Sequence, residues 1–145
     1  MTIKKSRGVW RGDSFADLET YVREFRAGGY PVGQVKEVVC RQCGGTSFAV
    51  SVDDEDGCAV TACLACRVEA PVADSADHLD DADIGECACP CGGETFAVAV
   101  GFAMTDDEEV RWISVGLRCL TDGTLGVYAD WKIDYEPSAH LLAGV

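Results

Sequence analysis

The chain has 145 residues, of which 48% are hydrophobic, and this length fits one ordinary domain or two small modules that each need a staple. The net charge of −13 is uneven, since residues 1–40 carry seven Lys and Arg against five acids and residues 41–145 carry five against twenty. The uncharged apolar runs are too short to span a membrane, and the acidic body repels nucleic acid phosphates.

The N-terminal residues are basic but have no apolar stretch behind them, which is not the pattern of a secretory signal. We therefore expect a cytoplasmic protein, in which close cysteine pairs bind metal rather than form disulfides. Ser14 or Asp13 can cap a helix that runs to about Ala27. One face of this helix is apolar, and we expect it to pack on the rest of the chain.

From Val35 onwards the pattern changes to short runs rich in Val, Phe, Trp and Tyr, which are typical of strands and hairpins. The sequence therefore predicts a mainly β fold with one N-terminal α-helix. Acidic runs at 53–57 and 105–109 each separate two predicted strands. We interpret both runs as solvated hairpin tips.

Four of the nine cysteines form two C-x2-C pairs, one before a predicted hairpin and one after it. Two residues between thiolates let one tight turn present both sulfurs to the same ion, and two such turns complete a tetrahedral shell. We expect a closed zinc site made by Cys40, Cys43, Cys63 and Cys66. Through CRQC and CLAC, residues 36–73 resemble the zinc-ribbon superfamily, a resemblance that implies the fold and the ligands but no particular role.

The same arrangement occurs a second time. Thirteen residues from Cys40 overlay thirteen residues from Ala88 with seven identities, and Cys63 falls on Cys119 once eight inserted residues are allowed for. We therefore predict two tandem zinc-ribbon-like modules. The predicted segments are a basic tail and helix at 1–34, a first ribbon at 35–73, an acidic linker at 74–86 and a second, divergent ribbon at 87–145.

The second copy departs from the pattern because Ala88 replaces one ligand and Asp122 replaces another. Two further cysteines flank Ala88, so the segment CACPC supplies three thiols in five residues. The expected ligands are Cys87, Cys89, Cys91 and Cys119, with Asp122 as an alternative oxygen ligand or as a hydrogen-bond acceptor beside the site. Two zinc ions per chain follow, and a metal-free second ribbon held by its apolar core is the alternative.

Other chemistry has less support. Cys58 lies outside both sets beside an acidic tip, where carboxylates raise the pKa of a thiol, and we interpret it as a bystander. Iron is an alternative to zinc because rubredoxin shares the ligand spacing, but the glycine expected after the second pair is absent from CLACRVEA. Only two histidines occur and no catalytic motif is present, so we predict no catalytic residues and a protein that is not an enzyme.

The sequence thus favours a non-enzymatic zinc protein that works as an acidic protein-interaction module, such as an adaptor, an inhibitor or an immunity-type partner. An acidic surface steers association with a basic protein and disfavours nucleic acid. Two alternatives remain open. Lys4, Lys5, Arg7 and Arg11 with Trp10 could contact nucleic acid, or the chain could carry electrons on iron or handle metal ions. The oligomeric state is not predicted.

Overall fold

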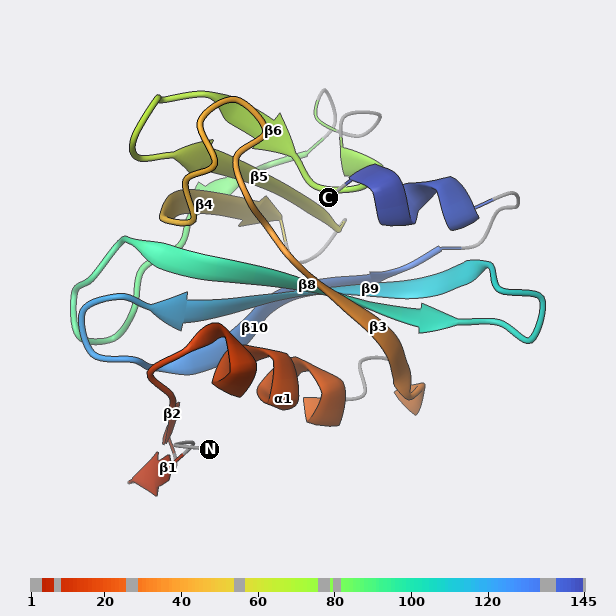
Figure 1. The fold of residues 1–145 in the computed structure, drawn as a ribbon, viewed down its shortest axis with the longest axis horizontal. Helices are drawn as coiled ribbons and strands as arrows, with labels where there is room; N and C mark the ends of the chain where they lie inside the picture. The colour runs from red at the N-terminus through yellow and green to blue at the C-terminus, as the bar shows by residue number, and fades with distance from the viewer. Residues whose placement is uncertain are drawn as a thin grey trace.

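A computed structural model describes residues 4–6, 9–25, 29–53, 57–75, 79, 82–133 and 138–144. This part of the chain is mainly β with one α-helix, which confirms the predicted fold class (Figure 1). The elements in chain order are β1 (Lys4–Ser6), β2 (Val9–Arg11), α1 (Phe15–Phe25), β3 (Val32–Glu37), β4 (Phe48–Asp53), β5 (Cys58–Cys63), β6 (Glu69–Pro71), β7 (Gly85–Glu86), β8 (Phe96–Met104), β9 (Val110–Cys119), β10 (Leu125–Lys132) and the 3-10 helix η3 (Ala139–Gly144).

Helix α1 begins at a reciprocal cap. The Asp17 backbone N–H donates to Ser14 Oγ at 3.4 Å, and the Asp13 backbone N–H donates to Asp17 Oδ2 at 3.0 Å. These two bonds satisfy N–H groups that have no partner within the helix. The helix ends at Phe25, and the predicted end at Ala27 lies outside the described residues.

The helix packs on its own chain, as its apolar face predicts. It covers one face of the layer formed by β8, β9 and β10, and the first hairpin lies on the other side of that layer (Figure 1). Leu18 and Val22 are fully buried. The contact is close because two strand residues are glycines: a Cβ atom on Gly116 would lie 2.3 Å from Val22 Cγ2, and one on Gly101 would lie 2.6 Å from Val22 Cγ1.

The larger sheet is antiparallel and has the strand order β10-β9-β8-β4-β5-β6, with β3 also pairing with β8 and β7 with β4. One apolar core runs through both copies. Phe48 and Val50 from the first copy share it with Phe96 and Trp131 from the second. The described residues contain no helix that is long and apolar enough to cross a membrane.

Strand pairing reproduces the sequence repeat. In the first hairpin Phe48 pairs with Cys63, and in the second Phe96 pairs with Cys119. Each hairpin then gains a returning third strand at the same place. The equivalent pairs are Ala62 with Glu69 and Arg118 with Leu125. The eight inserted residues lengthen β8 and β9 beyond the six residues of β4 and β5.

Each copy lends one strand to the other. We call β3 and β7 the lead-in strands, because each precedes the first metal-ligand turn of its own copy. Lead-in strand β3 pairs with β8 of the second copy, where Glu37 lies opposite Ala99. Lead-in strand β7 pairs with β4 of the first copy, where Glu86 lies opposite Ser51. The four predicted segment boundaries stay a prediction, but the two copies exchange their lead-in strands.

The exchange follows a local twofold relation. Phe48 pairs antiparallel with Phe96, its own counterpart in the other copy. A position that meets its own image is the mark of a twofold contact, in which every other contact occurs twice. The Val38 N–H accordingly donates to Val98 O at 3.0 Å, and the Cys87 N–H donates to Val50 O at 2.8 Å.

A fully buried serine follows the last strand of each copy. Ser75 Oγ accepts the backbone N–H of Ala59, and Ser138 Oγ accepts the backbone N–H of Val110, both at 2.9 Å. In the second copy Glu109 adds to this contact, because its carboxylate accepts the N–H groups that open η3. The run at 105–109 forms the predicted hairpin tip, whereas residues 54–56 of the other acidic run lie outside the described residues.

Candidate metal centres

The four cysteines predicted for the first site meet in one place. Cys40 and Cys43 come from the turn between β3 and β4, Cys63 ends β5, and Cys66 lies in the turn before β6. Their Sγ atoms all lie within 4.8 Å of one another, with separations of 3.5 Å for Cys40 to Cys66 and for Cys43 to Cys63. Tetrahedral sulfurs at about 2.3 Å from an ion lie about 3.8 Å apart, so this group could hold a metal ion.

Backbone hydrogen bonds shape the first turn of this site. The Cys40 N–H donates to Gly45 O and the Gly44 N–H donates to Cys40 O, both at 2.8 Å. Gly44 has a φ of 77°, which favours glycine. A Cβ atom on Gly45 would lie 3.1 Å from Cys63 Sγ, so the second glycine leaves room for the sulfurs.

The same turns favour thiolates. Backbone N–H groups of Cys43 and Gln42 lower the pKa of the Cys40 thiol to about 6. The backbone N–H of Cys66 is the main cause that lowers the pKa of the Cys63 thiol, against the opposing effect of burial. Because the thiolate is the form that binds metal, these turns prepare Cys40 and Cys63 for an ion. At Cys43 and Cys66 the backbone N–H groups are outweighed by burial and the neighbouring cysteines, which raise the pKa of both thiols.

The second site is a mixed group of three thiols and one carboxylate. Sγ atoms of Cys89, Cys91 and Cys119 and an oxygen of Asp122 all lie within 4.8 Å of one another. Cys91 Sγ lies 3.6 Å from Cys119 Sγ, and Cys89 Sγ lies 3.5 Å from Asp122 Oδ1. Three sulfurs and one oxygen are a reasonable shell for a metal ion such as zinc.

Asp122 holds the position that Cys66 holds in the first site. Its turn has the same backbone bonds, since the Gly123 N–H donates to Cys119 O at 2.8 Å, as Arg67 does to Cys63 at 2.9 Å. The Thr124 N–H donates to Asp122 Oδ1 at 3.0 Å and keeps the pKa of this carboxyl well below its usual range. The aspartate is therefore charged and held in place for a cation.

The N-terminal segment also supports Asp122. A guanidinium nitrogen of Arg11 lies 3.8 Å from Asp122 Oδ2, and the Gly12 N–H donates to Gly123 O at 2.9 Å. A Cβ atom on Gly123 would lie 2.5 Å from Gly12 O, so the close approach needs a glycine there. One of the basic N-terminal residues thus acts as a counter-charge beside the second site.

The first turn of the second site is one residue shorter than its counterpart. The Cys89 N–H donates to Gly93 O and the Gly92 N–H donates to Cys89 O, both at 2.8 Å, which repeats the bonds of Cys40. Cys89 therefore replaces Cys40, and the pair with Cys91 is C-x-C instead of C-x2-C. An alignment without a gap places Ala88 opposite Cys40 and misses this deletion.

Among the described residues, Cys87 is not part of the second group of ligands. Its backbone bond to Val50 makes it the counterpart of Val38, two residues before the first ligand of each copy. Both residues are buried in the shared core. An alignment that pairs Gly92-Gly93 with Gly44-Gly45 and allows a one-residue gap before them places Cys89 opposite Cys40 and Cys87 opposite Val38.

Cys58, the remaining cysteine, belongs to neither group. It opens β5, is fully buried, and donates its thiol to Ser75 O at 3.7 Å. Burial raises its pKa, with smaller contributions from nearby Asp53 and Asp74. This environment suits an unreactive thiol, in line with the bystander role predicted for it.

No family model, curated protein or solved structure matches this chain. The internal comparison between the two copies is informative instead. Both copies bring four donor atoms together from two turns at the same end of a three-stranded unit. The arrangement is compatible with two zinc-ribbon-like modules, each able to hold one metal ion.

Proposed function

We propose that this chain is a structural zinc protein with two closed sites that binds a basic partner protein. The observation that carries the proposal is the pair of four-donor groups within 4.8 Å. Structural zinc sites have four protein ligands, whereas catalytic ones keep a position open for water or substrate. With four donors in each group, the geometry favours a structural role for both ions.

Zinc fits the donors better than a harder ion does. Thiolates favour zinc or iron, and the carboxylate of Asp122 is also a common zinc ligand. Iron in a four-thiolate site absorbs visible light, so colour separates the two metals. We expect a colourless protein with about two zinc ions per chain by elemental analysis. A red protein, or one with a single metal ion, would contradict the proposal.

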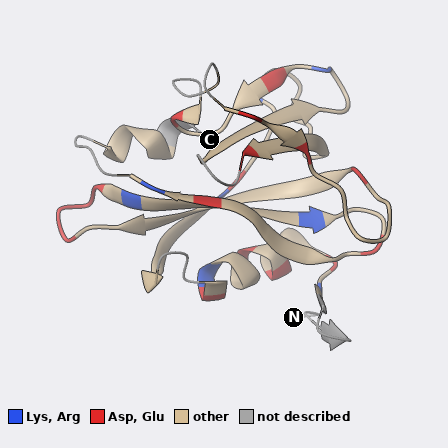
Figure 2. Cartoon of the chain, turned by 180° about the vertical axis from the view of Figure 1, so that it is seen from behind, with Lys and Arg blue, Asp and Glu red and all other residues tan. Residues whose placement is uncertain are grey.

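Charge supports the choice of partner. The net charge is −13, and acidic residues occur in every layer of the molecule while basic ones are few (Figure 2). Asp106, Asp107 and Glu108 are all exposed at the tip between β8 and β9. Such a surface attracts basic proteins at low ionic strength and repels nucleic acid.

The partner is tested by capture on the immobilised, zinc-loaded protein at about 50 mM and about 500 mM salt, because exposed charges are screened at high ionic strength. We expect basic proteins to be retained at low salt and released at high salt. The triple variant Asp106→Asn, Asp107→Asn, Glu108→Gln should retain less basic protein. Thr46→Ser changes an exposed residue without changing the charge and should behave as the unmodified protein. Retention of nucleic acid, or the same retention at both salt concentrations, would contradict a charge-steered protein contact.

A further inference from the structure

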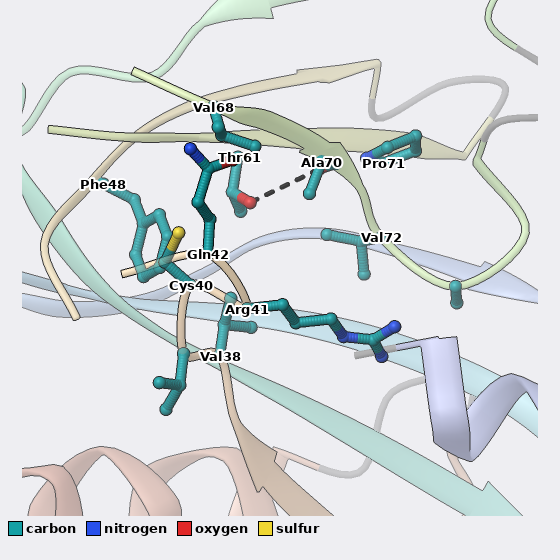
Figure 3. Close-up of a pocket in the computed structure, with 12 residues that line it drawn as sticks. Val38, Cys40, Arg41, Gln42, Phe48, Thr61, Val68, Ala70, Pro71 and Val72 are labelled. Atoms are coloured by element: carbon teal, nitrogen blue, oxygen red, sulfur yellow. Dashed lines mark hydrogen bonds between the residues drawn. The ribbon is translucent and has the colours of Figure 1, made fainter. Parts of the chain in front are cut away.

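A pocket of about 530 Å³ opens beside the first site (Figure 3). Phe48 forms part of its wall, and Val68 and Ala70 line it from the other side. Thr61 also lines it but donates its hydroxyl to Ala70 O at 3.3 Å. The lining is mainly apolar and the volume lies in the range of about 300–1,000 Å³ that is usual for ligand sites.

The twofold relation shows where the image of this pocket lies in the second copy. Strand pairing and the ligand turns match each wall residue with a counterpart. The matched pairs are Phe48 with Phe96, Ala70 with Gly126, Cys40 with Cys89, and Val38 with Cys87. The same space is therefore present twice in the fold.

In the second copy, Tyr128 occupies this space. Its ring centroid lies 5.7 Å from that of Phe96, with an interplanar angle of 59°. A Cβ atom on Gly126 would lie 3.0 Å from Tyr128 Cε1, so the ring lies over the counterpart of Ala70. The tilted contact between two rings is a favourable aromatic geometry.

The first copy has no counterpart of Tyr128 because the tyrosine is an extra residue. The register of β10 against β9 shifts between Val127 and Ala129, which makes Tyr128 the bulged residue. In the first copy, Pro71 pairs with Val60 and the next residue, Val72, already donates to Ala59 O at 2.9 Å. The chain therefore omits the one residue that would fill the pocket.

A second difference between the two copies also enlarges the pocket in the first. Thr61 stands where the second copy has Leu117, which is fully buried. The smaller side chain leaves more of the pocket open. The adjacent edge strand β6 is exposed at all three positions, so a ring attached to another polypeptide can reach the pocket from the surface.

We propose that this pocket binds an aromatic side chain of the partner protein, a tyrosine above all, which packs on Phe48 as Tyr128 packs on Phe96. This inference rests on the proposed function, since it names the contact that a protein partner makes. Arg41 and Gln42 line the same pocket from the first ligand turn, and both are exposed (Figure 3). In the proposed complex, Arg41 and Gln42 would contact the polar groups next to the partner's aromatic ring.

The test uses the zinc-loaded full chain and two probes: p-cresol, which is the tyrosine side chain alone, and N-acetyl-tyrosinamide, which carries peptide groups. Methyl NMR shifts of Val68 and Val72 report binding. Ala70→Phe fills the pocket from within. Glu69→Phe is the matched control, because it adds the same ring on the same exposed strand at a position that does not line this pocket. Zinc content and thermal unfolding verify that both variants fold.

We expect both probes to give saturable shifts in the unmodified chain and in Glu69→Phe, and binding at least roughly tenfold weaker in Ala70→Phe. No saturable shift with either probe would overturn the inference, even if salt-sensitive capture of basic proteins still succeeds. Binding of p-cresol alone would assign the pocket to a small aromatic molecule and overturn the protein contact. Equal retention of a captured basic partner by Ala70→Phe and by the unmodified chain would also overturn it.

Discussion

Cys87 and Cys89 are two residues apart but have different environments. Cys89 lies in a ligand turn, with its sulfur 3.5 Å from Asp122 Oδ1, whereas Cys87 lies in the shared core at the position of Val38. The alternation of side chains along an extended segment does not separate the two residues, because both fall on the same parity. The backbone bonds of the shortened turn separate them.

Single substitutions test this division. Cys89→Ser should reduce the zinc content from two ions per chain to about one, because it removes a thiolate from the second site. Cys87→Val should keep both ions and change the free energy of unfolding by less than about 1.5 kcal/mol, since it replaces one small buried apolar side chain with another. Elemental analysis and denaturant unfolding measure the two effects. Loss of one zinc ion from Cys87→Val would show that Cys87 is a ligand.

Glu109 gives the fold a dependence on pH. The backbone N–H groups of Ser138 and Ala139 lower the pKa of its carboxyl below the ordinary value. A lowered pKa in the folded state means that this stabilisation is fully present above the ordinary glutamate value of about 4.3 and is lost as the pH falls through the folded pKa. The contact that anchors η3 should therefore weaken in acid.

Glu109→Gln checks this dependence. We expect the variant to be less stable than the unmodified chain at neutral pH and the difference to shrink as the pH falls below about 4.3 and through the lowered folded pKa, because the carboxyl then becomes protonated in both folded and unfolded chains. Urea unfolding from pH 7 to pH 3 measures it, and Glu108→Gln, at an exposed neighbour, serves as the control. A difference that stays constant over this range would rule out a role for the charge.

Helix α1 packs on a strip of the sheet where two strand residues, Gly101 and Gly116, have no side chain. Val22 lies so close to Gly116 that any side chain there must displace the side chain of Val22 or the helix that carries it. Gly101 and Gly116 match Asp53 and Val60 of the first hairpin, so this strip comes from glycines at shared positions of the repeat and not from the inserted residues. The first copy has shorter strands, and its hairpin lies on the side of the β8, β9 and β10 layer that faces away from α1 (Figure 1).

Gly116→Ala should destabilise the protein by roughly 1–3 kcal/mol, because the new methyl group would lie 2.3 Å from Val22 Cγ2. Hydrogen exchange in α1 should accelerate. The double variant Gly116→Ala with Val22→Ala should be more stable than the sum of the two single effects, since each change relieves the other. Strictly additive effects would mean that the helix does not rest on this strip.

Sequence patterns predicted the helix, the hairpins, the first site and the repeat, because apolar periodicity and cysteine spacing record them directly. The exchange of β3 and β7 was not predictable from the same patterns. Main-chain bonds such as Val38 to Val98 join the copies without any requirement on side-chain type. The sequence also left open whether Asp122 or Cys87 belongs to the second group of donor atoms, because that choice depended on a one-residue deletion.

For the whole molecule, the exchanged strands and the shared core connect the two copies, and we expect them to unfold as one unit. Phe48 and Phe96 lie in the same core, and Trp131 of the second copy donates from Nε1 to Asp74 Oδ1 at 3.2 Å. Gly57 lies against the same tryptophan, where a Cβ atom would be 2.4 Å from Trp131 Cβ. A substitution that destabilises one copy should therefore destabilise the other.

Cys66→Ser provides the measurement. Loss of the first metal ion should remove much of the roughly 10–16 kcal/mol that structural zinc contributes in small domains. With Trp10→Phe in the same chain, the fluorescence of Trp112 and Trp131, both in the second copy, should follow the same lowered transition as far-UV circular dichroism. If the tryptophan signal keeps its original midpoint while the first copy unfolds, the two copies are independent.

Two separate chains, each with a single copy and its lead-in strand, would hold every group that the internal contact uses. Around the bridge of Phe48 with Phe96, each chain would offer a lead-in strand and accept one, as in a symmetric homodimer. Duplication and fusion of such a gene converts the dimer into one polypeptide, and the two halves are then free to diverge. In this chain one half has four clustered thiols and an open pocket, and the other has an aspartate in place of the fourth thiol and a tyrosine that fills the equivalent space.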